Sequence, residues 1–275
     1  ISFEFRTASP GISSSSRYVT LYEQSSPFEF CGVKVSQTTL SRRDKRLNPD
    51  KVLTNNLIKI ETENLNIFKL DLAHCSGTDT LTVEVDEVVF KELARSAGKE
   101  VWFGKTDNTW SMIEKPNSYN RKNPARYGNF KDAFRHQMLF VYATKGTKEE
   151  NEWALNKARF DAETFYYRGN GSIDIISDKE FKLTKYKDRS VIIYGNASTN
   201  SAWKLLLADS PVQVKRNEIS LGNKILGGSQ WGTYFIRPRK DSKVASVGVV
   251  AGTGIQGALS VNPNKYFVSG TGFPD

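Results

Sequence analysis

Cysteine and histidine are both scarce, and their scarcity excludes several kinds of site. The 275 residues include two of each, too few for a disulfide-stabilised scaffold or a four-cysteine zinc site. Because Cys31 and Cys75 each lie in or beside a predicted strand, we expect two buried free thiols, with a single bridge as the alternative. His74 and His136 are expected to be structural. No metal site and no cofactor are predicted.

The sequence also lacks a recognisable catalytic nucleophile. It has no G-x-S-x-G motif, the sharp turn that presents the serine of α/β-hydrolases. Ser172 precedes a predicted strand, whereas a serine in that turn follows one. No catalytic residue is therefore assigned in this chain.

Long hydrophobic runs are absent as well. No run approaches the ~18 apolar residues that a membrane-spanning helix requires, so no membrane span is predicted. The opening residues, ISFEFRT, alternate between apolar and polar side chains instead of forming a signal peptide. Because the first residue is not Met, we expect a processed or excised piece.

Charges of both signs are abundant. There are 39 basic and 30 acidic residues, a formal charge of +9, which suits nucleic acid or an anionic surface. The two signs are mixed along the chain, however, so nucleic acid is not expected as a partner. The basic stretch 41–51 is interpreted as a solvated loop, with a phosphate-binding patch as the alternative.

The length and the spacing of apolar residues predict an α+β chain of two domains. Short alternating strands recur about every ten residues in 1–116, a pattern typical of an antiparallel β-sandwich, with a helix conceivable only around 91–97. Trp102 and Trp110 would stack on sugar rings if exposed, whereas burial would mark them as core. The polar segment 117–131 contains prolines and is predicted to be a crossover or linker.

Residues 132–275 are predicted to form a three-layer, flavodoxin-like α/β domain with a mostly parallel sheet. The apolar run MLFVYAT precedes a long helix whose start carries a capping box of Thr147 and Glu150 and whose end lies at 169–171. The strands IDIIS and SVIIYGN follow, so the order is strand, helix, strand, as in a βαβ unit. Ser198 is expected to cap a short second helix.

Two strand ends carry the residues that we predict to bind a ligand. In open α/β sheets ligands bind beyond the carboxyl ends of the strands, where backbone N–H groups can hold an anion. The predicted crevice consists of Gly195, Asn196, Thr199, Gly252, Thr253 and Gly254. The string GTGIQG also matches the dinucleotide pattern G-x-G-x-x-G, but it lies late in the chain with no second βαβ half, so a tight turn is the main interpretation.

Several long strings together resemble a known family. They are FKDAFRHQMLFVYATKGTKEENEWALNKARFDAETFYYRGNGSIDIISD, DRSVIIYGNASTNSAWKLLLADSPVQV, VGVVAGTG and YFVSG. This part resembles the region C-terminal to the hydrolase domain in secreted bacterial prolyl-oligopeptidase-like proteins. The beginning, FRTASPGISSSSRYVTLYEQ, resembles the stretch that follows the α/β-hydrolase domain there. The likeness covers nearly the whole chain.

The resemblance implies a Ser-His-Asp esterase or peptidase upstream of this chain, although none of its triad matches a residue here. It implies a non-catalytic accessory region that packs on the hydrolase domain or shapes access to it, with secretion to the periplasm or the outside. The alternative is a ligand- or carbohydrate-binding module with a small-molecule or anion crevice at the strand ends. The expected substrates are a peptide, an ester or a carbohydrate.

Overall fold

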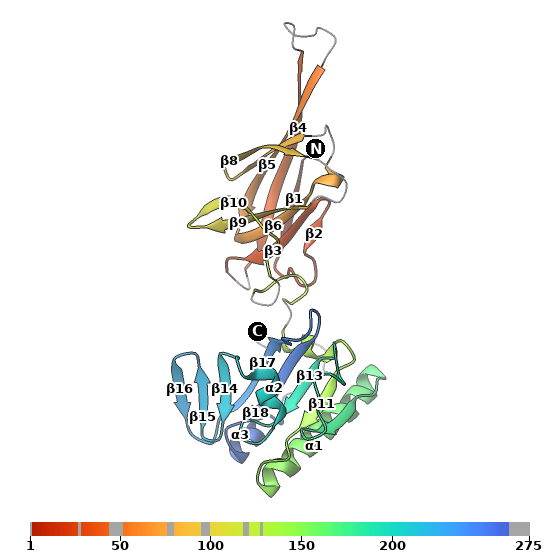
Figure 1. Cartoon of the computed structure of the whole chain (residues 1–275), viewed down its shortest axis with the longest axis vertical. Coiled ribbons are helices and arrows are strands. Elements are labelled where there is room, and N and C mark those ends of the chain that lie inside the picture. Colours follow the sequence, from red (N-terminus) through yellow and green to blue (C-terminus); the bar gives the residue numbers. More distant parts are fainter. Residues whose placement is uncertain are drawn as a thin grey trace. The chain divides into compact units, whose positions relative to one another are not determined.

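The computed structural model describes residues 2–26, 29–43, 52–75, 80–94, 100–117, 121–126 and 129–263. The chain divides into two compact units, Ile1–Tyr127 and Gly128–Asp275. The first is built mostly from strands, and the second combines strands with helices (Figure 1). The expected strand at 265–273 and the part of the basic stretch at 44–51 lie outside the described residues.

The first unit contains two five-stranded sheets. The first sheet consists, in spatial order, of β1 (Ser2–Thr7), β4 (Cys31–Arg43), β5 (Val52–Glu63), β7 (Thr80–Val85) and β8 (Val88–Ala94). The second consists of β10 (Thr109–Ile113), β9 (Glu100–Thr106), β6 (Leu65–Asp71), β3 (Val19–Gln24) and β2 (Ser15–Ser16), and a short 3-10 helix, η1 (Leu72–His74), follows β6. All neighbours pair antiparallel except β5 and β7, which are parallel.

One apolar core joins these two sheets. Alternate residues of the first sheet, such as Val33 and Ile58, are buried against residues of the second, as expected for strands with one buried face. In the second sheet the rings of Phe68 and Phe103 stack at 5.0 Å. Cys31 and Cys75 are buried in this core as free thiols, which confirms the first of the two alternatives.

The prediction of a helix around 91–97 is wrong for residues 91–94, which the structure describes. The chain there belongs to β8, which pairs with β7. Phe90 packs against the core and contacts Phe103 edge to face at 5.0 Å. Pairing and burial thus override the weak local preference for a helix.

The second unit contains a five-stranded sheet that is only partly parallel. Its order is β12 (Asp174–Ser177), β11 (Leu139–Tyr142), β13 (Val191–Tyr194), β18 (Ser246–Gly252) and β17 (Gly232–Pro238). The first four strands are parallel, and β17 pairs antiparallel with β18. A separate antiparallel sheet consists of β14 (Val212–Lys215), β15 (Glu218–Leu221) and β16 (Lys224–Gly227).

The prediction of a flavodoxin-like, mostly parallel domain is therefore not confirmed. The short connection between β17 and β18 allows these strands to pair antiparallel, whereas a parallel pair would need a longer crossover. Residues 178–190, between β12 and β13, form turns where that fold would place a helix. The connection from β13 to β18 holds the three-stranded sheet as well as a short helix.

Helices pack on one face of the five-stranded sheet, and a short helix, turns and two further strands pack on the other. On one face lie η2 (Phe130–Phe134), α1 (Lys148–Gly169) and α3 (Ile255–Ser260), which pack on residues such as Phe140 and Val250. On the other face lie α2 (Ala202–Leu207), the turns at 178–190 and the inner side of β14 and β15. Because β12, β11, β13 and β18 are parallel, their carboxyl ends lie at the same edge of the sheet.

The capping residues of α1 and α2 can be compared with those expected from the sequence. Thr147 Oγ1 accepts from Glu150 N at 3.2 Å, and Glu150 Oε2 accepts from Thr147 N at 2.7 Å, so the capping box is confirmed. Asn170 ends α1 in the left-handed conformation. Ser198 does not cap α2: the N-cap position is Ser201, because the chain makes further turns after β13.

Candidate functional site

The strand-end residues singled out in the sequence come together. β13 and β18 are parallel neighbours, with Tyr194 opposite Val250, so the turns that follow them lie side by side. These turns, together with α1 and α3, enclose a cavity of about 10 Å³. Its lining consists of Glu150, Trp153, Gly195, Asn196, Thr199, Gly252, Gly254 and Ala258. A volume of that size is about what one water molecule needs.

Asn196 uses its polar groups within the protein. Its Nδ2 donates to Gly252 O at 2.8 Å, and its Oδ1 accepts from Ser198 N at 2.9 Å. Its backbone N–H donates to Thr199 Oγ1 at 3.0 Å. The side chain is 3% exposed. Asn196 thus fastens the turn after β13 to the end of β18.

Three of the backbone N–H groups expected to hold an anion donate within the protein instead. Gly195 N donates to Val250 O at 3.0 Å, and Thr199 N donates to Asn196 O at 3.0 Å. Thr253 N donates to Trp231 O at 2.9 Å. These contacts give the strand ends a structural role, and binding of a ligand by the six predicted residues stays a prediction.

The glycines of GTGIQG allow backbones to pack closely. A Cβ atom on Gly252 would lie 2.1 Å from Ala258 N, and one on Gly257 would lie 2.1 Å from Trp231 O. Backbone therefore fills the space in front of the motif, where a pyrophosphate would need a vacant crevice. The helix that begins within the motif, at Ile255, is only six residues long. The geometry agrees with the tight-turn interpretation.

A buried carboxylate beside these turns was missed from the sequence. Asp178 follows β12 and is 3% exposed. Its Oδ1 accepts from Thr144 Oγ1 at 2.6 Å, and its Oδ2 accepts from Ser201 N and Oγ at 2.6 Å each. Its position directly after a predicted strand could have pointed to it. Through these three hydrogen bonds Asp178 links the end of β12 to Thr144, which follows β11, and to Ser201 at the start of α2.

No histidine completes a triad with Ser201 and Asp178. His136 lies three residues before Leu139, the first residue of β11, so it lies at the amino end of the strands. His74 belongs to the first unit, where its Nδ1 lies 2.8 Å from Asp71 Oδ2 at the surface. Across the described parts of the chain, no group of three or more His, Cys, Asp or Glu side chains is arranged to hold a metal ion.

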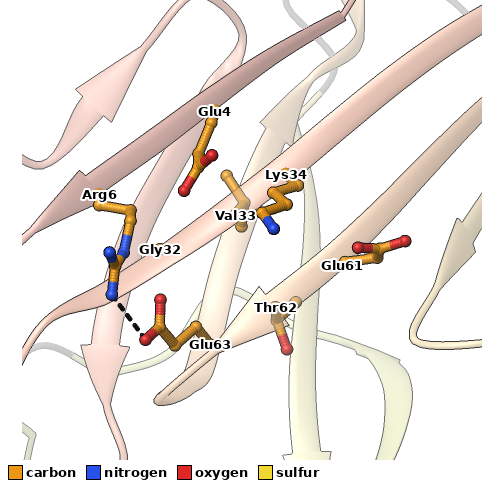
Figure 2. A pocket seen from close by; sticks show the side chains of 8 residues that line it. All are labelled: Glu4, Arg6, Gly32, Val33, Lys34, Glu61, Thr62 and Glu63. Carbon is orange, nitrogen blue, oxygen red and sulfur yellow. Dashed lines mark hydrogen bonds and ion pairs between the residues drawn. The ribbon is translucent and has the colours of Figure 1, made fainter.

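A larger hollow lies on the outer face of the first sheet (Figure 2). Its volume is about 380 Å³. It is lined by Glu4, Arg6, Gly32, Val33, Lys34, Glu61, Thr62 and Glu63. These residues come from β1, β4 and β5, and we call this site the Gly32 hollow.

Strand register explains the arrangement of the Gly32 hollow. Lys34 of β4 lies opposite Glu4 of β1 and Glu61 of β5. In the neighbouring row Gly32 lies between Arg6 and Glu63, whose side chains form an ion pair of 2.7 Å (Figure 2). The Gly32 hollow thus lies among the charged side chains of three neighbouring strands.

The two tryptophans considered for sugar stacking are core residues. Trp102 is 7% exposed and meets Tyr22 edge to face at 4.9 Å. Trp110 is 3% exposed, and its Nε1 donates to Asp86 Oδ2 at 2.8 Å. A sugar cannot stack on either ring, so the carbohydrate hypothesis loses the residues on which it rested.

A scan against protein-family models finds no match, and a search of curated proteins finds no significant relative. Among the helices of the described segments, none combines the length and the apolar character needed to cross a membrane.

Proposed function

We propose that this chain is a non-catalytic accessory region of a secreted prolyl-oligopeptidase-like serine hydrolase. The observation that carries the proposal is the strand-end edge of the second unit, where the cavity measures only about 10 Å³ and the side chains of Asn196 and Asp178 make internal hydrogen bonds. An α/β unit that bound a substrate at this edge would need an open crevice there. The sequence resemblance supplies the partner, an upstream α/β-hydrolase domain of the same polypeptide.

The proposed role is positional. The region would pack against the hydrolase domain, shape the entrance to its active site and present a peptide or ester substrate. In the second unit the strand order β12-β11-β13-β18 supports a variant of the flavodoxin-like arrangement, altered by antiparallel β17 and by the added three-stranded sheet.

A serine-reactive fluorophosphonate probe tests the proposal. The chain alone and a longer polypeptide that includes the upstream segment are incubated with the probe and assayed with a p-nitrophenyl ester and a proline-containing peptide. We expect labelling and turnover of the longer polypeptide and neither with the chain alone. Ser201→Ala serves as a control because Ser201 is the serine bonded to buried Asp178.

Two results would contradict the proposal. One is labelling of the chain alone that Ser201→Ala or another serine substitution abolishes. The other is an upstream segment that contains no serine hydrolase. A positional role further predicts that deleting this region from the longer polypeptide changes KM for the peptide more than kcat for the small ester.

A further inference from the structure

We infer that the Gly32 hollow binds a neutral saccharide. This inference concerns the first unit and does not depend on the proposed partnership with a hydrolase. Its starting point is the shape of the site. The hollow has a volume of about 380 Å³, and β1 approaches Gly32 so closely that a Cβ atom there would lie 2.6 Å from Phe5 O and 2.7 Å from Arg6 Cγ.

The polar groups around the hollow alternate between donor and acceptor. Lys34 lies directly opposite Glu4 and Glu61 in the register, a placement in which opposite charges ordinarily pair. Among the described residues, however, none of these three side chains forms an ion pair within 4.0 Å. An ammonium group and two carboxylates are therefore available to a ligand at one site (Figure 2).

The lining disfavours strongly charged and apolar ligands. Three carboxylates face two cations, so the charges of the lining nearly cancel. Val33 directs its side chain into the core, where it is 2% exposed, and Thr62 donates its hydroxyl to Asp86 at 2.6 Å. The hollow thus offers almost no apolar side-chain surface, whereas a lipid or an aromatic ligand would need one.

A saccharide fits this pattern because each sugar hydroxyl both donates and accepts a hydrogen bond. Neighbouring hydroxyls can donate to Glu4 or Glu61 while they accept from Lys34. The volume of about 380 Å³ lies at the lower end of the range of roughly 300–1,000 Å³ for ligand pockets and suits a short oligosaccharide. Phe30, 57% exposed beside the Arg6 guanidinium, offers an apolar face at the margin.

Calorimetric titration of the full chain with neutral oligosaccharides tests the inference. The probes are cellohexaose, xylohexaose, mannohexaose and maltohexaose, each at low and high sodium chloride. We expect at least one to bind with Kd on the order of 1 mM. Because the ligand is uncharged, added salt should leave its affinity unchanged.

Substitutions locate the site. Lys34→Met and Glu61→Gln each remove one ligand-facing group and should weaken binding about tenfold. Lys59→Met is the matched control: Lys59 belongs to the same strand as Glu61 but is paired with Glu84 and does not line the hollow. It should leave binding unchanged, and thermal melts verify that every variant is folded.

Three outcomes would overturn the inference. They are the absence of binding by all four neutral oligosaccharides, equal binding by wild type and Lys34→Met, and binding limited to oligogalacturonate or oligolysine that disappears at high salt. The last outcome would identify an ordinary charged surface. None of them bears on fluorophosphonate labelling, so this inference and the proposed function can fail separately.

Discussion

The Asp86 carboxylate accepts a hydrogen bond from Trp110 Nε1 at 2.8 Å and thereby connects the two sheets of the first unit. Asp86 lies in the turn between β7 and β8 of one sheet, and Trp110 belongs to β10 of the other. The same carboxylate accepts from Thr62 N at 2.8 Å and Thr62 Oγ1 at 2.6 Å. One side chain thus satisfies three donors.

Asp86→Ala should destabilise the first unit strongly. It leaves the buried Trp110 indole and the Thr62 groups without their acceptor, and we expect a loss of about 2 to 4 kcal/mol in the free energy of unfolding. Urea denaturation followed by tryptophan fluorescence measures it. Asp107→Ala controls for backbone strain, because Asp107 has a φ of 48° against 42° at Asp86 but an exposed side chain. Equal losses in the two variants would refute the hydrogen-bond explanation.

Glu150 should make the second unit sensitive to acid. Its carboxylate binds Arg216 through Oε1 at 3.2 Å and Oε2 at 2.6 Å, and Arg216 and the Thr147 cap hold its pKa below the usual value. A depressed pKa in the folded state stabilises the protein above the unfolded value of about 4.3, and this stabilisation is lost as pH falls through the folded pKa.

Glu150→Gln should therefore cost about 1 to 2 kcal/mol at neutral pH and almost nothing below the folded pKa. Thermal melts of both proteins across the acidic range measure the difference. Glu149→Gln is the matched control, because Glu149 shares the first turn of α1 and its dipole but is exposed. A Glu150→Gln deficit that persisted at low pH would show that packing, and not charge, is responsible.

Local features of the fold could be predicted from the sequence. The capping box depends on Thr147 and Glu150, which are three residues apart, so one turn of chain contains all its atoms. Short apolar runs likewise revealed β11 and β13. The meeting of the turns after β13 and β18 followed from the general rule for parallel strands.

Features that depend on distant residues could not be predicted. The direction of β17 is decided by pairing with β18, and the packing of Gly252 depends on the backbone of α3. The burial of Asp161 on α1 depends on Tyr194, which lies 33 residues away and donates to its carboxylate. The Gly32 hollow needs the register of three strands, two of them far from β1 in sequence.

The buried pair of Lys157 and Asp161 gives a third prediction. Their Nζ and Oδ1 atoms lie 2.6 Å apart at 3% exposure each, and Tyr194 donates to Asp161 Oδ2 at 2.9 Å. Lys157→Met leaves a buried carboxylate without its cation and should cost about 3 to 5 kcal/mol. Lys148→Met, at an 88% exposed lysine of the same helix, should cost little.

The pH dependence of the Lys157→Met variant identifies the cause. Burial raises the pKa of Asp161, and loss of Lys157 should raise it further. The folded variant then holds a proton that the unfolded chain releases, so its stability should fall as pH rises from about 3.9 towards the folded pKa. Melting temperatures measured over that interval test this. The double variant with Asp161→Leu should recover most of the stability and lose the pH dependence.

Substitution of Gly252 tests whether this glycine is needed for close packing or for ligand binding. Gly252→Ala places a Cβ atom 2.1 Å from Ala258 N, and backbone cannot move aside as a flexible side chain can. We expect a loss of about 3 kcal/mol or more in the free energy of unfolding.

Gly227→Ala is the matched control for this substitution. It also adds a methyl group to a strand glycine, but nothing lies within 4 Å of the new atom, so the change in stability should stay within about 0.5 kcal/mol. Urea denaturation of both variants, with and without ATP or NAD, separates the two roles. If Gly252 serves packing, the nucleotides should not alter the stability of wild type. Stabilisation of wild type by either nucleotide, lost in Gly252→Ala, would instead show that the turn binds phosphate, because a ligand that binds only the folded state raises stability by mass action.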